Sequence, residues 1–329
     1  MKKTLTLCIL VALLTLTLTS PLVLGGSERV KVAVTTNVLA CLVRVVGGER
    51  VEVTCLIPPL SDIHEYAPKP GDKKAIEEAD VYVEVGFEPF REQLLRGVDL
   101  TGKVVVSWES YLAEGVKVLE NGNPHIWLDP ENAYLMAKAI CKALIKVDPE
   151  NSAYYLKNLE KFAEEVERLK VYRDTTVKSL GVDRLKVLLV TPCPEYLLRW
   201  LGVRVVNVVA SSEEKVPGIK QIEKVKEQAK KEGVNVVVCT IQEKNTWMGK
   251  LARSLASELG VPVAYLTPLL LEPNETYPEL IKTNVMLLLA AADQGEMPVL
   301  RVKKASTPLY LAILGLLVAL TLETLIIVR

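Results

Sequence analysis

Short runs of β-branched residues alternate with amphipathic segments through the first half of the chain. The predicted strands cover residues 30–36, 51–57, 80–86 and 103–108. Helical patterns at residues 37–48 and 73–79 lie between them, and the first of these ends in glycine. Strands that alternate with helices indicate a parallel sheet covered on both faces.

The same alternation returns in the second half. Strands are predicted at residues 185–191, 203–209, 234–240 and 261–266. Helices are predicted at residues 194–202, 219–233, 248–260 and 277–292. The second half therefore predicts another parallel sheet with helices on its faces.

A long helical pattern separates these two halves. Residues 129–180 are nearly continuous helix, broken at V-D-P-E-N over residues 147–151. The second part has about thirty residues, or roughly 45 Å at 1.5 Å per residue, which is longer than a compact lobe needs. The sequence thus predicts an α/β fold with two Rossmann-like parallel-sheet lobes joined by one long spine helix. A site is expected between the lobes.

The two ends of the chain are strongly apolar. M-K-K followed by an apolar run predicts a secretory signal, and residues 308–328 carry one charge, Glu323, over a length that crosses a bilayer. The expected organisation is a signal peptide at 1–26, an N-terminal lobe at 27–149, a spine at 150–180, a C-terminal lobe at 181–299 and a transmembrane anchor at 308–328. The body is then expected on the extracytoplasmic face of the cell membrane, held by a single-pass C-terminal helix.

Charge and short motifs exclude several classes of function. The 40 basic and 40 acidic residues balance, and no basic block indicates a nucleic-acid partner. The chain has no G-x-S-x-G, H-E-x-x-H or phosphate-loop motif, so no enzyme is predicted. Disulfides are permitted outside the cell, but the sequence leaves their pairing open. The cysteines after the signal are Cys41, Cys55, Cys141, Cys193 and Cys239.

Only two histidines occur in the 329 residues, and both lie in short segments rich in proline and acidic residues. His64 lies in S-D-I-H-E-Y-A-P-K-P-G-D and His125 in N-P-H-I-W-L-D-P. A lone histidine is more often an ordinary surface or core residue than a ligand. Here, however, His64 follows a predicted strand on the side of the sheet where ligands bind. Neutral imidazole is a good ligand for zinc and similar metals.

These two segments resemble the ligand motifs of a known family. I-P-P-L-S-D-I-H-E-Y-A-P-K-P-G-D and N-P-H-I-W-L-D-P-E-N-A are similar to motifs of the metal-binding solute-binding proteins of zinc and manganese ABC importers, and the likeness covers roughly residues 30–292. The resemblance implies that His64 and His125 hold Zn or Mn as the transported ligand in an interlobe cleft. It also implies delivery to an importer permease by a monomer, here tethered to the membrane by its C-terminal helix.

The second lobe departs from the family pattern. The family's third and fourth ligands fall on Thr191 and Thr267, whose neutral hydroxyls are poor zinc ligands. Either Cys193 or Glu195 is a candidate replacement for the third ligand. Cys239 and Glu243 are the corresponding candidates for the fourth ligand. An equally good interpretation of Cys193 and Cys239 is that they form a disulfide or remain two free thiols. A further alternative is that the same scaffold binds a metal chelate or another solute that is not a bare cation.

Overall fold

The computed structural model describes residues 29–58, 63, 66–210, 216–272 and 274–294. The predicted signal peptide, the predicted anchor at 308–328, and His64 all lie outside this part of the chain. Among the helices that are described, none combines the length and apolar character needed to cross a bilayer. No disulfide joins any two of the five cysteines in the described residues.

The first sheet is parallel, with strand order β2-β1-β3-β4. Its strands are β1 (Val30–Val34), β2 (Val51–Cys55), β3 (Val81–Val83) and β4 (Val104–Val106). The helices of this lobe are α2 (Asn37–Gly47), α3 (Pro70–Glu78), α4 (Arg91–Leu95) and α5 (Trp108–Ala113). The two short helices α4 and α5 are additions to the elements that the sequence pattern predicts.

The second sheet repeats this topology, with strand order β6-β5-β7-β8. Its strands are β5 (Lys186–Leu189), β6 (Arg204–Val208), β7 (Val236–Thr240) and β8 (Val263–Leu266). The helices are α8 (Glu195–Trp200), α9 (Ile219–Glu232), α10 (Trp247–Leu259) and α11 (Tyr277–Gln294). In both sheets the strand order reverses beside the first strand, and ligands of open α/β sheets bind outside the carboxyl ends of the strands at that point.

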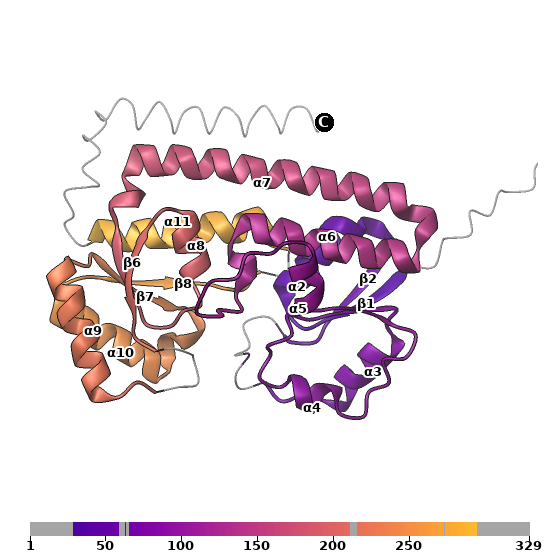
Figure 1. Cartoon of the computed structure of the whole chain (residues 1–329), viewed down its shortest axis with the longest axis horizontal. Coiled ribbons are helices and arrows are strands. Elements are labelled where there is room, and N and C mark those ends of the chain that lie inside the picture. The colour runs from indigo at the N-terminus through magenta and orange to yellow at the C-terminus, as the bar shows by residue number, and fades with distance from the viewer. Residues whose placement is uncertain (1–28, 59–62, 64–65, 211–215, 273, 295–329) are drawn as a thin grey trace, which may run out of the picture.

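The long helix α7 (Ser152–Leu180) runs over both lobes (Figure 1). It follows α6 (Pro130–Val147), whose first turn is capped by the Asp129 carboxylate, which accepts a hydrogen bond from the Glu131 amide at 2.7 Å. The predicted break between the two helices is confirmed, because Asp148 and η3 (Pro149–Asn151) separate them. Gly181 ends α7 at φ 64°, a left-handed conformation that glycine adopts without a steric penalty. Other single turns are η1 (Gly48–Arg50), η2 (Ile126–Leu128), η4 (Val182–Arg184) and η5 (Gln242–Asn245).

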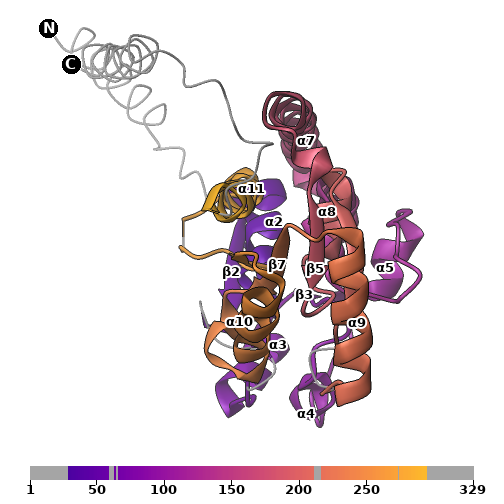
Figure 2. The same ribbon diagram turned by 90° about the vertical axis from the view of Figure 1, so that its left-hand side faces the viewer.

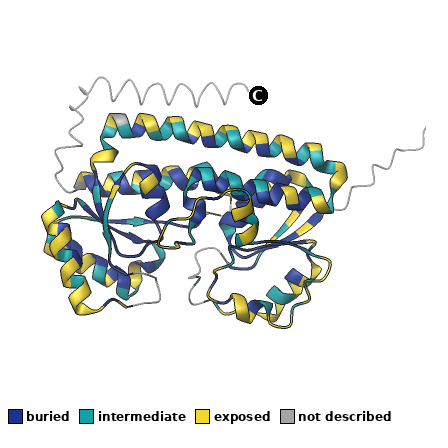
Figure 3. Ribbon diagram, viewed as in Figure 1, coloured by how far each residue is buried: buried dark blue, intermediate teal, exposed yellow. Residues whose placement is uncertain are grey.

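The hydrophobic core is continuous between the lobes. Alternate residues of each strand point to opposite faces, so Val32 and Val187 enter a cluster that also contains α2, α6, α7 and α11. The other faces are packed separately, with Ala33 under α3 and α4 and with Leu188 under α9 and α10. Figures 2 and 3 show α7 opposite those outer helices, and the inner strands β1, β3, β5 and β7 are buried between the layers. Both lobes therefore share one packed layer.

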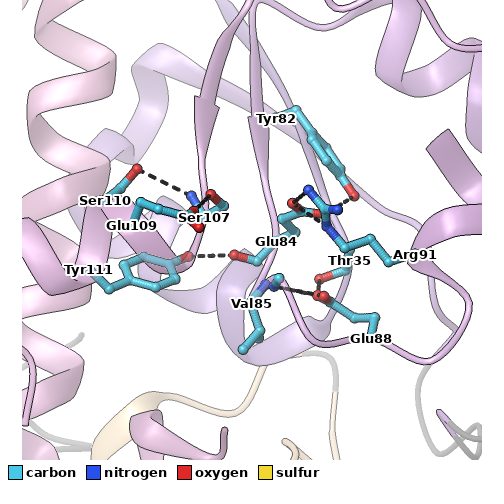
Figure 4. A network of polar contacts seen from close by, with 11 residues as sticks. Thr35, Tyr82, Glu84, Val85, Glu88, Arg91, Ser107, Glu109, Ser110 and Tyr111 are labelled. Atoms are coloured by element: carbon cyan, nitrogen blue, oxygen red, sulfur yellow. Dashed lines mark hydrogen bonds and ion pairs between the residues drawn. The ribbon is translucent and has the colours of Figure 1, made fainter. Parts of the chain in front are cut away.

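A buried polar network lies at the carboxyl edge of the first sheet (Figure 4). The Glu84 carboxylate accepts hydrogen bonds from Arg91 Nε at 2.7 Å and from the Tyr82 hydroxyl at 3.1 Å. Glu88 accepts the Thr35 hydroxyl at 2.6 Å and the Val85 amide at 2.8 Å. Burial raises the pKa of the Glu84 carboxyl, while its hydrogen bond to Arg91 acts in the opposite direction.

The Arg91→Met variant is expected to lower the free energy of unfolding by about 2 kcal/mol. The Glu84 side chain is fully buried, and removing its cation leaves a buried carboxylate without compensation. Urea unfolding measures the loss. The control is Arg96→Met, which breaks an exposed pair with Glu92 and should cost less than about 1 kcal/mol. Equal losses for both variants would contradict this account of the network.

Candidate metal centre

The two lobes meet through hydrogen bonds between segments that follow their strands. We call this region the interlobe seam and define it by Asn37, Asn123, Trp127, Pro192, Pro268 and Leu270. The Asn37 side chain donates to the Leu270 carbonyl at 2.8 Å, and Trp127 Nε1 donates to the Pro268 carbonyl at 2.7 Å. The Tyr277 hydroxyl donates to the Trp127 carbonyl at 2.7 Å. The carboxyl ends of β1 and β8 are thus held close together.

His125 lies at this seam, immediately before η2, and is half-buried. Its ring Nδ1 lies 2.8 Å from Asn123 Oδ1, and its backbone amide donates to the same oxygen at 3.0 Å. The orientation of the Asn123 amide is set by its nitrogen, which donates to the Pro192 carbonyl of the second lobe at 2.6 Å. Because Oδ1 can only accept, Nδ1 carries the proton and Nε2 carries the lone pair. This is the tautomer that coordinates a metal through Nε2.

Ile63 and Tyr66 are the described residues nearest to His64. Ile63 packs against the hydrophobic clusters of the first lobe. The Tyr66 hydroxyl lies 2.9 Å from the Leu56 carbonyl and 2.8 Å from the Asp72 carboxylate. The first of these contacts ties Tyr66 to Leu56, the residue that follows β2.

Glu243 is the centre of a buried cluster in the second lobe. Its Oε2 accepts hydrogen bonds from the Thr240 amide at 3.0 Å, the Cys239 thiol at 3.2 Å and the Thr191 hydroxyl at 3.3 Å. These donors follow or end β5 and β7, where the strand order reverses. Burial raises the pKa of the Cys239 thiol, with Glu243 adding to the effect, so Cys239 is held as a thiol that donates to the carboxylate.

Thr267 is occupied by local hydrogen bonds. Its hydroxyl donates to the Leu269 carbonyl at 2.6 Å and accepts from the Leu269 amide at 3.2 Å. The side-chain nitrogen of Gln242 approaches the same oxygen at 3.5 Å. The side chain of Thr267 is therefore committed to shaping the loop after β8.

The remaining two candidates are engaged elsewhere. Glu195 is buried, and its carboxylate accepts from Asn121 Nδ2 at 2.7 Å and from Arg199 Nη2 at 2.7 Å. Cys193 is buried in the hydrophobic cluster that the two lobes share. Among the candidate ligands chosen from the sequence, the structure brings Thr191, Cys239 and Glu243 together. Glu195 lies apart from them and pairs with Arg199.

Sequence reasoning missed two polar side chains at this site, Asn123 and Gln242. The signal for Asn123 is its position two residues before His125 in the N-P-H motif. Gln242 is the neighbour of Glu243 and contacts the Thr267 position. Within the described ranges, which omit His64, histidine, cysteine and acidic side chains form no group of three or more that could hold a metal. Amide oxygens such as that of Gln242 are a further class of possible ligand.

Comparison with known proteins gives a consistent result. The family model for ZnuA, the zinc-uptake complex component A periplasmic, matches residues 32–291. The chain is 31% identical over 193 residues to the metal ABC transporter substrate-binding lipoprotein FimA of Streptococcus parasanguinis, covering 54% of this chain and 62% of FimA. It is 26% identical over 276 residues to the manganese-binding lipoprotein MntA of Halalkalibacterium halodurans, covering 81% of this chain and 90% of MntA. The match to FimA thus spans less than two thirds of that relative's length.

Solved structures show the same likeness. The solute-binding protein FpvC of Pseudomonas aeruginosa, in complex with Ni²⁺, superposes with a TM-score of 0.69 at 25% identity, covering 82% of this chain and 99% of FpvC. A crystal structure of ZnuA superposes with a TM-score of 0.66 at 24% identity, covering 80% of this chain and all of the other. The second likeness shows the fold alone.

Proposed function

The chain belongs to the ZnuA family of periplasmic zinc-uptake components, and from this premise we propose that it captures a divalent transition metal between its lobes and delivers it to the permease of an ABC importer. The family comprises substrate-binding transport proteins and not enzymes. The metal is proposed to be Zn or Mn, and it is cargo rather than a resident cofactor. Relatives whose names specify manganese or iron support a transition metal as the cargo class.

The geometry of His125 is the observation that carries this proposal. Asn123 holds the proton on Nδ1, so the ligand nitrogen Nε2 is prepared before a metal arrives. A metal that binds through Nε2 can leave the Nδ1 hydrogen bond to Asn123 in place. His64 is proposed as the second imidazole ligand, supported by its motif.

Glu243 is proposed to supply the carboxylate from the second lobe. Its three donors, Thr191, Cys239 and Thr240, fix the carboxylate at the carboxyl ends of β5 and β7. Thr191, at the family's third ligand position, would then orient a ligand rather than act as one. Glu195 is less suitable because Arg199 and Asn121 already neutralise and occupy its oxygens.

Attachment and domain limits are further proposals. We retain the signal peptide at 1–26, lobes at 27–149 and 181–299, a spine at 150–180 and an anchor at 308–328. The apolar run of residues 308–328 supports an extracytoplasmic body tethered to the cell membrane. Relatives that are named lipoproteins support the proposal that this chain, too, is attached to a membrane. We also propose that the body is a monomer.

The test is metal content of the full-length chain. Protein stripped with a chelator is dialysed against Mn²⁺ or Zn²⁺, and elemental analysis gives the metal bound per chain. One equivalent of either metal, with heat of binding in calorimetry, supports the proposal. If neither metal is retained, the scaffold binds a metal chelate or another solute and the proposed function is wrong.

Replacing Asn123 with leucine is expected to weaken metal binding by about 10- to 100-fold, the range for losing a partner that orients a ligand. Asn123→Asp should retain most of the affinity, because a carboxylate oxygen still accepts the Nδ1 proton. Nitrogen-15 NMR of the two imidazoles reports the tautomer directly. An unchanged tautomer in Asn123→Leu would contradict the role given to this amide.

A further inference from the structure

One buried oxygen beside Glu243 has no hydrogen-bond donor in the described residues, namely Oε1 of Gln242. Leaving a buried acceptor unpaired costs about 1–3 kcal/mol, so native proteins rarely do so without a reason. Gln242 begins the turn η5 just after β7, next to the point where the strand order of the second sheet reverses. The oxygen therefore belongs to the ligand-binding edge of this lobe.

The contact with Thr267 fixes the orientation of the Gln242 side-chain amide. The threonine proton is donated to the Leu269 carbonyl, so its oxygen can only accept from other groups. The group of Gln242 that approaches it at 3.5 Å must be the NH₂ donor. The carbonyl oxygen then points away from Thr267.

The position of this amide relative to His125 follows from the interlobe seam. Thr267 precedes Pro268, whose carbonyl accepts from Trp127 Nε1 at 2.7 Å, and the Trp127 ring lies 5.2 Å from the His125 ring, centroid to centroid. Two contacts thus connect Gln242 to the loop that carries His125.

The turn that carries Gln242 and Glu243 is closely packed against α10. A Cβ atom on Gly249 would lie 2.2 Å from the Lys244 carbonyl oxygen and 2.6 Å from that of Glu243. Only glycine allows α10 to approach η5 this closely. The two side chains are therefore presented by a rigid turn, which is a requirement for a preorganised site.

We propose that the carbonyl oxygen of Gln242 is a metal ligand, so that the second lobe binds its cargo through the adjacent residues Gln242 and Glu243 after β7. This inference rests on the proposed function of metal capture. An amide oxygen and a carboxylate are hard ligands that suit Mn²⁺ better than thiolate-rich sets do, whereas imidazole suits Zn²⁺. Gln242 thereby shifts selectivity toward the harder metal.

The experiment uses the full-length chain and five proteins: the parent, Gln242→Leu, Gln242→Glu, Gln228→Leu and His125→Ala. Gln228 is an exposed glutamine on α9 of the same lobe and is the matched control. Each protein is stripped and titrated with Mn²⁺ and with Zn²⁺ against a competing chelator. Thermal unfolding of the metal-free proteins is recorded in parallel.

Gln242→Leu is expected to raise the Mn²⁺ dissociation constant at least about tenfold, because even partners outside the ligand shell contribute that much, and to raise the Zn²⁺ constant less. Gln242→Glu should retain Mn²⁺ binding. The metal-free midpoint of Gln242→Leu should not fall, since an unpaired buried oxygen is removed.

Two results would overturn the inference. In one, Gln242→Leu binds both metals as tightly as the parent, while His125→Ala loses them; the metal site then stands without Gln242. In the other, affinities for both metals fall equally and the metal-free midpoint falls with them, which identifies a structural role. If His125→Ala also binds like the parent, it is the proposed function itself that has failed.

Discussion

The His125→Ala variant is expected to raise the dissociation constant for the bound metal more than about a hundredfold. Partners that only orient a ligand already account for about 10- to 100-fold, and this change removes the proposed ligand itself. The ring is half-buried at the interlobe seam, and its Nδ1 donates a hydrogen bond to Asn123 Oδ1. The variant therefore loses a prepared ligand and not a flexible surface group.

Competition titration with a chelator measures this loss for Mn²⁺ and Zn²⁺ separately. The control is Glu120→Ala, which removes an exposed side chain of the same loop. That variant should keep metal affinity close to the parent value. If the two variants lose affinity to the same extent, the effect belongs to the loop, and His125 is not a ligand.

The second large effect is expected for Glu243→Gln, with an increase of about a hundredfold in the dissociation constant. The amide keeps the size of the side chain but removes the negative charge that we propose balances a divalent cation between the lobes. Thr191 and Cys239 both donate to this carboxylate, so its position is set by two strands. The loss should appear for every divalent metal tested.

Glu195→Gln is the matched comparison for this variant. The carboxylate of Glu195 pairs with Arg199, whose side chain is largely exposed. Because Glu195 is buried and hydrogen-bonded, its replacement should cost about 1–3 kcal/mol of stability and leave metal affinity unaltered. A loss of metal binding confined to Glu195→Gln would transfer the carboxylate ligand from Glu243 to Glu195.

The architecture was largely predictable because it depends on local patterns. β-branched runs of four to seven residues between amphipathic segments indicated two parallel sheets, and V-D-P-E-N indicated the break before the long helix, α7. The short helices α4 and α5 were not predicted, since five or six residues are too few to show helical periodicity. His125 was identifiable because its motif is a contiguous segment.

By itself, the sequence determined the two α/β lobes, the helix across them and the candidate imidazole ligands, because each is encoded within one short stretch of chain. Only the tertiary structure decided how the second lobe is arranged. Thr191, Cys239 and Glu243 meet because parallel strands place distant residues at one sheet edge. The same folding placed Asn121 on Glu195 and directed the Gln242 amide at Thr267. These hydrogen bonds join residues that are far apart in the sequence, so no local pattern predicts them.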